Sequence, residues 1–465
     1  MKYLPLGSSD AIGASCHYLQ IDGTGILLDT GVDPEEDGLD GLPRFDLVSE
    51  HPDRPLDHVM VTHAHHDHLG ALPVVIKKFP HVSAHMTRAT RDLADILLPA
   101  SARLQERKQR EGTSPADPVF SEEDAEASSY VCETHELESS FDVTGLRGSV
   151  PVRARFYDAG HVLGSVGILL EFKNGKDINR VFFTGDTGMQ KQTILPGASY
   201  PQDPVDTLLL ECTLGADPET ERTTRREEET RLGEAIASTL KRKGTVLIPV
   251  FALGRGQEIL ALVDRFKQRG IFDEETPVYT AGLMRAIANI YDKTSHTTPR
   301  LNEDFQVFGV SQSRLPRSHT ALKAALSEPS IHVVGSGMVF ERTISNRLAQ
   351  ALAEDKKNAI LMVGYTPPES PGHQILEAAR EGRGTKVVID RVRGEQPLNC
   401  TVERFRFSGH SHRRDLLSLV GKLSPKKIVL VHGEKAARKW MAENIRYFHP
   451  EIEVYSPETG EEINI

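Results

Sequence analysis

The sequence has little of what membrane or secreted proteins require. Its longest apolar runs, such as Ala359-Ile360-Leu361-Met362-Val363, fall far short of the ~20 residues that cross a bilayer. The first residues, Met1 to Pro5, lack the apolar core of a signal peptide. The four cysteines show no paired spacing; they are Cys16, Cys132, Cys212 and Cys400. We therefore expect reduced thiols, a cytoplasmic location and no membrane partner.

Basic residues are outnumbered by acidic ones. The chain carries 55 Lys and Arg against 66 Asp and Glu, a formal net charge of −11. A broadly basic surface is thereby excluded, so a nucleic-acid substrate would have to meet a local basic rim and bound metal ions. With 465 residues, 38% hydrophobic and 26% charged, the composition is that of a globular enzyme of two domains, each with its own core.

Histidine, by contrast, is concentrated in one segment. His63-Ala64-His65-His66-Asp67-His68 follows the apolar run Val59-Met60-Val61 and precedes Leu69-Gly70. Imidazoles with one carboxylate suit zinc, or less selectively manganese, iron or cobalt, and the missing thiolate argues against a closed structural site. A His-rich surface turn is the alternative, but such a turn would need neither the β-run nor ligands further along the chain. The segment predicts an open metal site that does chemistry.

Three more candidates stand where strand-like runs end. Asp29 follows Gly25 to Leu28, His161 lies in the glycine-flanked stretch 158–165, and Asp186 follows Val181 to Thr184. Each alone would ordinarily be a turn or structural residue. Beside the histidine segment, His161 and Asp186 supply a further imidazole and a carboxylate able to bridge. Two ions ~3.5–4 Å apart can then share one hydroxide and clamp a phosphoryl group.

These motifs, in this order, resemble the successive motifs of the metallo-β-lactamase superfamily. Residues 208–213, Leu-Leu-Leu-Glu-Cys-Thr, resemble the acidic motif of its β-CASP nucleases, and residues 248–258 resemble that group's most recognisable block. The chain looks most like the polyadenylation-factor endonuclease branch and its prokaryotic RNA-processing relatives.

The resemblance implies an α/β fold, a metallo-β-lactamase αβ/βα sandwich with an inserted β-CASP α/β domain. Strand-like and helix-like runs also alternate from Thr245 onward, which independently predicts a parallel sheet there. We expect the metallo-β-lactamase domain over residues 1–200, the β-CASP domain over 201–390, and the return of the first domain over 391–465.

The resemblance also implies the metal ligands. Two Zn²⁺ are expected, with Mn²⁺ as the alternative. One ion is assigned to His63, His65 and His161, the other to Asp67, His68 and His410, and both to Asp186. His432, in the closing-strand motif 427–434, is expected near the site without binding metal. Asp67 is also expected to receive the proton of the attacking water, and Asp29 to orient ligands.

The expected proton donor to the leaving group is His373, paired with Glu211. It lies in the block 364–376, where Gln374 competes for the same position. The substrate contacts expected are Arg255 and the small residues Ser336 and Gly337 after a strand. A structural arginine and a tight turn are the alternative interpretations.

The function implied is that of a zinc-dependent ribonuclease acting on single-stranded RNA, with a homodimer expected because relatives are often dimers. Endonuclease or exonuclease action, RNA or DNA preference and the native metal are left open. Two alternatives remain, a metallo-hydrolase of a small ester or thioester and a catalytically weak β-CASP scaffold.

Overall fold

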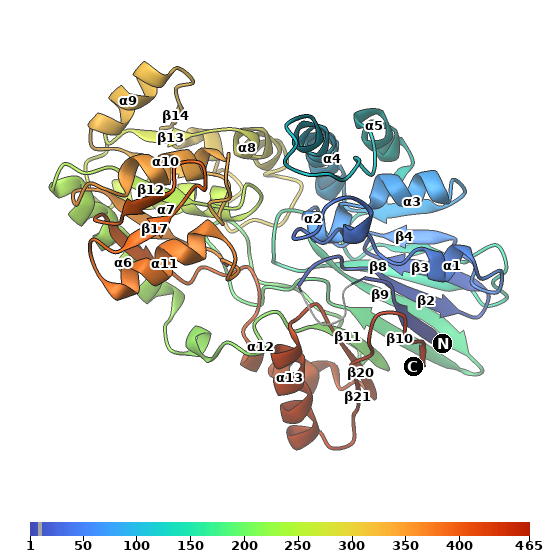
Figure 1. Cartoon of the computed structure of the whole chain (residues 1–465). Helices are drawn as coiled ribbons and strands as arrows, with labels where there is room; N and C mark the ends of the chain where they lie inside the picture. The colour runs from blue at the N-terminus through green and yellow to red at the C-terminus, as the bar shows by residue number, and fades with distance from the viewer. Residues whose placement is uncertain (8–11) are drawn as a thin grey trace. The chain divides into compact units, whose positions relative to one another are not determined.

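The computed structural model describes residues 1–7 and 12–465, without the side chains of residues 174 and 220. The chain divides into two compact units (Figure 1). The first unit comprises Met1–Lys191, Pro196–Pro218 and His410–Ile465, and the second unit comprises Gln192–Leu195 and Glu219–Gly409.

Two seven-stranded sheets form the first unit. The first sheet has the order β22 (Ile463–Asn464), β1 (Lys2–Pro5), β2 (His17–Ile21), β3 (Thr24–Leu28), β4 (His58–Met60), β5 (Ser83–Met86), β6 (Cys132–Thr134). The second sheet has the order β21 (Glu453–Tyr455), β20 (Lys427–Val431), β11 (Thr207–Glu211), β10 (Asp177–Phe183), β9 (Val166–Asn174), β8 (Val152–Asp158), β7 (Ser140–Asp142). Buried residues of both sheets, among them Leu28, Met60, Ile168 and Leu209, form one core between them.

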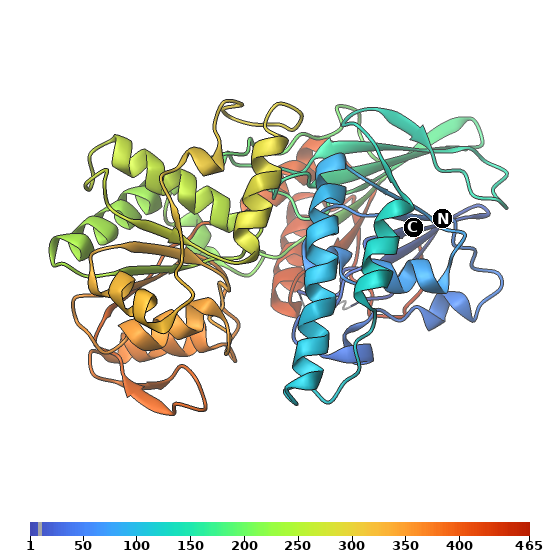
Figure 2. The same ribbon diagram turned by 90° about the horizontal axis from the view of Figure 1, so that it is seen from above.

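Helices cover this pair of sheets on both sides. Figure 1 and Figure 2 show α3 (Leu72–Lys78), α4 (Arg88–Arg110) and α5 (Glu122–Tyr130) on one side. On the other side, α12 (Arg413–Leu423) and α13 (Lys435–Phe448) pack onto β11 and β20 through a second apolar cluster. The shorter helices of this unit are η1 (Gly38–Gly41), α1 (Asp46–Ser49) and α2 (His66–Leu69). The expected αβ/βα sandwich is confirmed.

A six-stranded sheet organises the second unit. Its order is β14 (Ser313–Arg314), β13 (Val278–Thr280), β15 (Ile331–Val334), β12 (Val246–Pro249), β16 (Ala359–Met362), β19 (Thr401–Arg404). Every neighbouring pair is parallel, as predicted. All four residues of β12, of β15 and of β16 are buried, which is typical of parallel strands covered on both faces.

The helices of the second unit connect these strands. They are α6 (Arg225–Lys241), α7 (Arg255–Gln268), α8 (Leu283–Lys293), α9 (His319–Ser327), α10 (Ile344–Leu352) and α11 (Pro371–Glu381), with η2 (Pro218–Glu221) and η3 (Val307–Gly309). A small hairpin of β17 (Lys386–Val388) and β18 (Glu395–Pro397) precedes β19. Thr224 begins α6 with a capping box, since its side chain accepts from the Glu227 backbone N–H while the Glu227 side chain accepts from the Thr224 backbone.

The borders between units differ from the expected positions 200 and 390. Strand β11 pairs in parallel with β10 and β20, so the chain stays in the first unit until Pro218. Strand β19 pairs with β16, which keeps the chain in the second unit until Gly409. Composition does not encode these pairings, and the sequence-based borders therefore fall about twenty residues early, as estimates of element boundaries from sequence often do.

All four cysteines are free. No helix among the described residues is both long and apolar enough to cross a membrane.

Buried His332 on β15 is expected to make the stability of the second unit depend on pH. Its ring is fully buried, stacks on Tyr279 and hydrogen-bonds the Ser330 hydroxyl at 3.0 Å. Burial lowers the pKa of His332 to about 4. In the unfolded chain the histidine pKa is ~6.5, so on acidification the unfolded state is protonated before the folded state. The free energy of unfolding should therefore fall as the pH drops from ~6.5 to ~4, by roughly 3 kcal/mol in total.

We expect His332→Gln to remove this part of the pH dependence. The measurement is hydrogen exchange of the β15 amides at pH 7 and pH 5, corrected for intrinsic exchange rates. The exposed His319→Gln serves as control and should behave as wild type. Equal acid sensitivity in wild type and His332→Gln would contradict the assignment.

Candidate metal centre

The candidate site lies in the first unit, where several strands end. His161 follows β8, Asp186 follows β10, Glu211 ends β11 and His432 follows β20. Strands β10, β11 and β20 are parallel neighbours, so their carboxyl ends meet at one edge of the second sheet. This is the edge at which α/β proteins commonly hold ligands.

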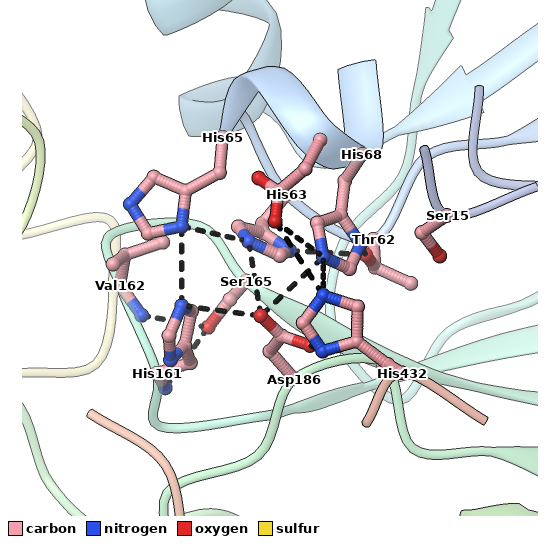
Figure 3. Close-up of polar contacts among 12 residues, drawn as sticks. Ser15, Thr62, His63, His65, His68, His161, Val162, Ser165, Asp186 and His432 are labelled. Atoms are coloured by element: carbon pink, nitrogen blue, oxygen red, sulfur yellow. Dashed lines mark hydrogen bonds and ion pairs between the residues drawn. The ribbon is translucent and has the colours of Figure 1, made fainter. Parts of the chain in front are cut away.

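The first sheet delivers the histidine segment to the same place. After β4 the chain passes through Thr62 and His63, and His65 is the N-cap of α2. Figure 3 shows the side chains of His63, His65 and His68 turned toward those of His161, Asp186 and His432.

Three imidazoles and one carboxylate form a first ligand group. His65 Nδ1 lies 3.0 Å from His63 Nε2 and 3.2 Å from His161 Nε2. Asp186 Oδ2 lies 3.8 Å from His63 Nε2 and 3.6 Å from His161 Nε2. The ligand atoms of these four residues all lie within 4.8 Å of one another, as expected of atoms around one ion.

Asp67, His68 and His432 form a second ligand group. His432 Nε2 lies 3.3 Å from His68 Nε2 and 3.4 Å from Asp67 Oδ2. Asp186 reaches this group as well, because its Oδ1 is 3.0 Å from His432 Nδ1 and its Oδ2 is 3.4 Å from His68 Nε2. One carboxylate therefore faces both groups, as expected of a bridging ligand.

A third contact joins His410 to Glu211. His410 Nδ1 lies 3.2 Å from Glu211 Oε1 and 3.9 Å from Asp186 Oδ2. The Glu211 carboxylate is fully buried and accepts from the backbone N–H groups of Thr187 at 3.1 Å and Thr213 at 3.0 Å. Because these amides fix Glu211, its carboxylate in turn fixes the His410 ring.

His410 and His432 lie in different parts of the site. The assignment of His410 as a ligand beside Asp67 and His68 stays a prediction; in the structure His432 is the imidazole beside Asp67 and His68, while His410 lies with Asp186 and Glu211 in a further group whose atoms could hold an ion. Strand pairing explains the place of His432. Glu211 pairs with Val431, so the next residue, His432, reaches the edge of the site, where it adopts a left-handed backbone with φ +47°.

Asp29 lies against His68, where its expected orienting role stays a prediction. Its Oδ1 accepts from the Thr62 backbone N–H at 2.7 Å, and its Oδ2 lies 2.7 Å from His68 Nδ1. With Nδ1 engaged by a carboxylate, His68 presents Nε2 to the ligand group, which is how carboxylates orient metal-binding histidines.

Burial and neighbouring charged groups shift the pKa values of several site residues. Burial lowers the pKa of His63, and His68 and His65 lower it further, so this imidazole is neutral and available as a ligand. Burial raises the pKa of Asp186, but His432, His68 and His410 outweigh it and hold the pKa well below its usual range. For His410 burial acts downward, while Glu211 and Asp186 raise the pKa to about 9.

The donor set fits a divalent transition ion. Asp186 Oδ1 is buried and, among the residues that the structure describes, accepts no hydrogen bond of good geometry, although His432 Nδ1 lies 3.0 Å away. A buried carboxylate oxygen is costly unless positive charge faces it, which either a protonated histidine or a metal ion supplies. Imidazole nitrogens together with carboxylate oxygens are the ligands that zinc takes in catalytic sites.

The expected substrate contacts lie in the second unit. Arg255, the first residue of α7, is buried, and its guanidinium lies 3.4 Å from Gln192 Oε1. Ser336 and Gly337 follow β15, where a Cβ on Gly337 would come within 3.1 Å of the Phe251 backbone nitrogen. Arg255 and Gly337 therefore pack against neighbouring residues, and the contacts of Arg255, Ser336 and Gly337 with substrate stay predictions.

His373 also lies in the second unit, on α11. Its Nε2 is 3.7 Å from Glu377 Oε1, whereas Gln374 beside it is exposed. The side chain that the structure places on Glu211 is that of His410. The role of His373 as proton donor stays a prediction.

Comparison with known families matches three parts of the chain. Residues 10–222 match the metallo-beta-lactamase superfamily, residues 256–375 the Beta-Casp domain, and residues 395–457 the Zn-dependent metallo-hydrolase RNA specificity domain. A crystal structure of a protein of unknown function from Enterococcus faecalis has a TM-score of 0.58 at 14% identity, covering 100% of this chain and 99% of that one, which is a likeness of fold alone.

Several characterised proteins are similar over nearly the whole chain. The transcription termination factor FttA of Methanocaldococcus jannaschii is 30% identical over 95% of this chain and 68% of its own length. The cleavage and polyadenylation specificity factor 73 of Drosophila melanogaster is 28% identical over 94% of this chain and 60% of its own. The endoribonuclease ysh-1 of Neurospora crassa is 28% identical over 100% of this chain and 56% of its own. The chain thus spans little more than half the length of the two eukaryotic proteins.

The two ligand groups predict different effects of removing His432 and His410. We expect His432→Gln to lose about one zinc ion per chain, because it removes a ligand of the second group. His410→Gln should retain the wild-type zinc content, since its partner is Glu211. The number of zinc ions per chain, measured by plasma mass spectrometry after desalting, shows whether His432 or His410 is the ligand. A zinc loss in His410→Gln with none in His432→Gln would restore the assignment expected from the sequence.

Proposed function

Because the chain belongs to the β-CASP group of the metallo-β-lactamase superfamily, we propose that it is a zinc-dependent ribonuclease that hydrolyses phosphodiester bonds in single-stranded RNA. The observation that carries the proposal is the joint presence of two ligand groups sharing Asp186 and of the His410–Glu211 pair beside them. Two-metal hydrolysis of a phosphodiester uses these groups, namely ligands for two metal ions and a separate proton donor.

Different residues of the chain are assigned to holding the metal ions, accepting the proton and orienting the ligands. When bound, two zinc ions would supply a water of pKa lowered toward ~7 and neutralise charge on the phosphoryl oxygens. Asp186 holds the two ligand groups together, and Asp67, whose pKa is lowered by His68 and His432 against the effect of burial, receives the proton of the attacking water. Asp29 keeps His68 in the tautomer that frees Nε2.

His410 is the proposed donor to the leaving 3′ oxygen. Glu211 beside it favours the protonated form of the imidazole, and the His410 side chain is 20% exposed while that of Glu211 is fully buried. Glu211 is the positioning residue, since it fixes the ring of His410 without meeting solvent. His373, the donor expected from the sequence, is the second candidate.

RNA as the substrate is supported by two observations. Residues 395–457, which include His410 and His432, match a domain described as conferring RNA specificity. Two relatives are named an endoribonuclease and a cleavage and polyadenylation specificity factor. We propose internal cleavage of RNA on the same grounds. A homodimer in solution and a cytoplasmic location complete the proposal, the former measurable by light scattering.

We expect the zinc-loaded protein to cleave 5′-labelled and 3′-labelled single-stranded RNA, and matched DNA more slowly. Asp67→Asn should abolish cleavage. His410→Ala and Glu211→Gln should slow it by ~10²–10⁴-fold, the usual contribution of a general acid. The zinc content of each variant is measured as a control, so that a slower reaction is not mistaken for metal loss. Undiminished cleavage by Asp67→Asn would contradict the mechanism.

A substrate with sulfur in place of the leaving 3′ oxygen identifies the proton donor. A thiolate leaves without protonation, so the sulfur substrate should restore cleavage by His410→Ala but not by Asp67→Asn. If His373→Ala is rescued instead, and His410→Ala is not, the donor is His373.

A further inference from the structure

A second group of histidines lies at the β6 edge of the first sheet. His58 is on β4, His85 is on β5, and His135 directly follows β6. His85 pairs with Glu133 across β5 and β6, and His58 pairs with Ser83, two residues before His85. Residues two apart on a strand point to the same face. His58, His85 and His135, here called the imidazole row, therefore share a face with Glu133.

The row contains a ligand group of its own. His85 Nδ1 lies 3.0 Å from His135 Nε2 and 4.0 Å from Glu133 Oε2. The ligand atoms of these three residues all lie within 4.8 Å of one another. Zn–N bonds of ~2.0–2.1 Å in a tetrahedral site place two nitrogens about 3.3 Å apart. The spacing of 3.0 Å is also that of His63 Nε2 and His65 Nδ1 in the candidate metal centre.

Neighbouring side chains orient both imidazoles. His85 Nε2 lies 3.0 Å from His58 Nδ1, so that Nε2–H can donate to His58 and leave Nδ1 as the ligand atom. Histidines that bind metal usually donate their second N–H in this way. The His135 ring stacks on Phe141 with centroids 3.5 Å apart and 4° between planes. Both rings are thus held with their nitrogens facing each other.

The surroundings of the row favour a cation. The carboxylates of Asp57, Glu133 and Asp142 act electrostatically on His58, and Glu133 also acts on His135. His85 is 2% exposed, whereas the Glu133 side chain is 60% exposed. The group thus runs from the edge of the core to solvent, so that an ion can enter without unfolding the sheet.

We propose that His85, Glu133 and His135 form a further metal site that binds one zinc ion, with water as the fourth ligand. His58 is the positioning residue of this site. The ion would join β5 to β6, the last strand at this edge of the sheet. The proposal stands independently of the ribonuclease activity, because it concerns residues outside the two ligand groups that share Asp186.

Zinc content tests the proposal. The protein is loaded with Zn²⁺, freed of loose metal by desalting, and its zinc per chain is measured by plasma mass spectrometry. The double variant Glu133→Gln/His135→Gln should hold one equivalent less than wild type. The exposed His51→Gln, in the same unit, is the matched control and should hold the wild-type amount.

A second measurement separates metal loss from misfolding. Glu133→Gln alone changes an exposed side chain, and Co²⁺ titration should show one fewer equivalent of tightly bound cobalt in this variant, with an unchanged circular dichroism spectrum. Equal zinc in wild type and the double variant, with equal cobalt in wild type and Glu133→Gln, would overturn the proposal and leave the row as a chain of hydrogen-bonded imidazoles. RNA cleavage plays no part in either readout.

Discussion

The carboxylate of Asp186 is the constraint on which the site depends. It is 2% exposed and faces His63 and His161 on one side and His68 and His432 on the other. A buried carboxylate among so many imidazoles is stable only where positive charge compensates it. The preceding Gly185 makes the position possible, because its φ is +52° and a Cβ there would lie 2.9 Å from the Thr62 side chain.

The fold delivers the ligands through strand pairing. Three adjacent parallel strands bring Asp186, Glu211 and His432 to one edge of the second sheet, and β4 of the first sheet brings the histidine segment. Rigid strands hold such groups more closely than free loops would. The two ligand groups around Asp186 and the His410–Glu211 pair thus lie side by side, with His410 Nδ1 3.9 Å from Asp186 Oδ2 and 3.2 Å from Glu211 Oε1.

Local sequence was enough to predict part of this. The histidine segment, Asp29, His161 and Asp186 each stand near the end of a strand-like run, and strand–helix alternation indicated the parallel sheet of the second unit. The positions of His410 and His432 were not accessible in this way. Which imidazole reaches Asp67 depends on the pairing of β11 with β20 and on the left-handed backbone of His432. Neither the strand pairing nor this backbone conformation can be inferred from the spacing of residues along the chain.

The imidazole row was missed for the same reason. His58 and His85 are 27 residues apart, and His85 and His135 are 50 apart, so only the pairing of β4, β5 and β6 brings them together. Two signals were present in the sequence, a histidine within the apolar strand around His85 and the alternation of Glu133 with His135. Neither indicates a metal until the register of the strands is known.

A crystal structure of the zinc-loaded protein, with anomalous scattering recorded at the zinc edge, tests the central claim most directly. Two peaks are predicted around Asp186, one bounded by His63, His65 and His161, the other by Asp67, His68 and His432. His410 should lie outside bonding distance of both, in contact with Glu211. A single peak there, or a zinc bound by His410 in place of His432, would contradict the account.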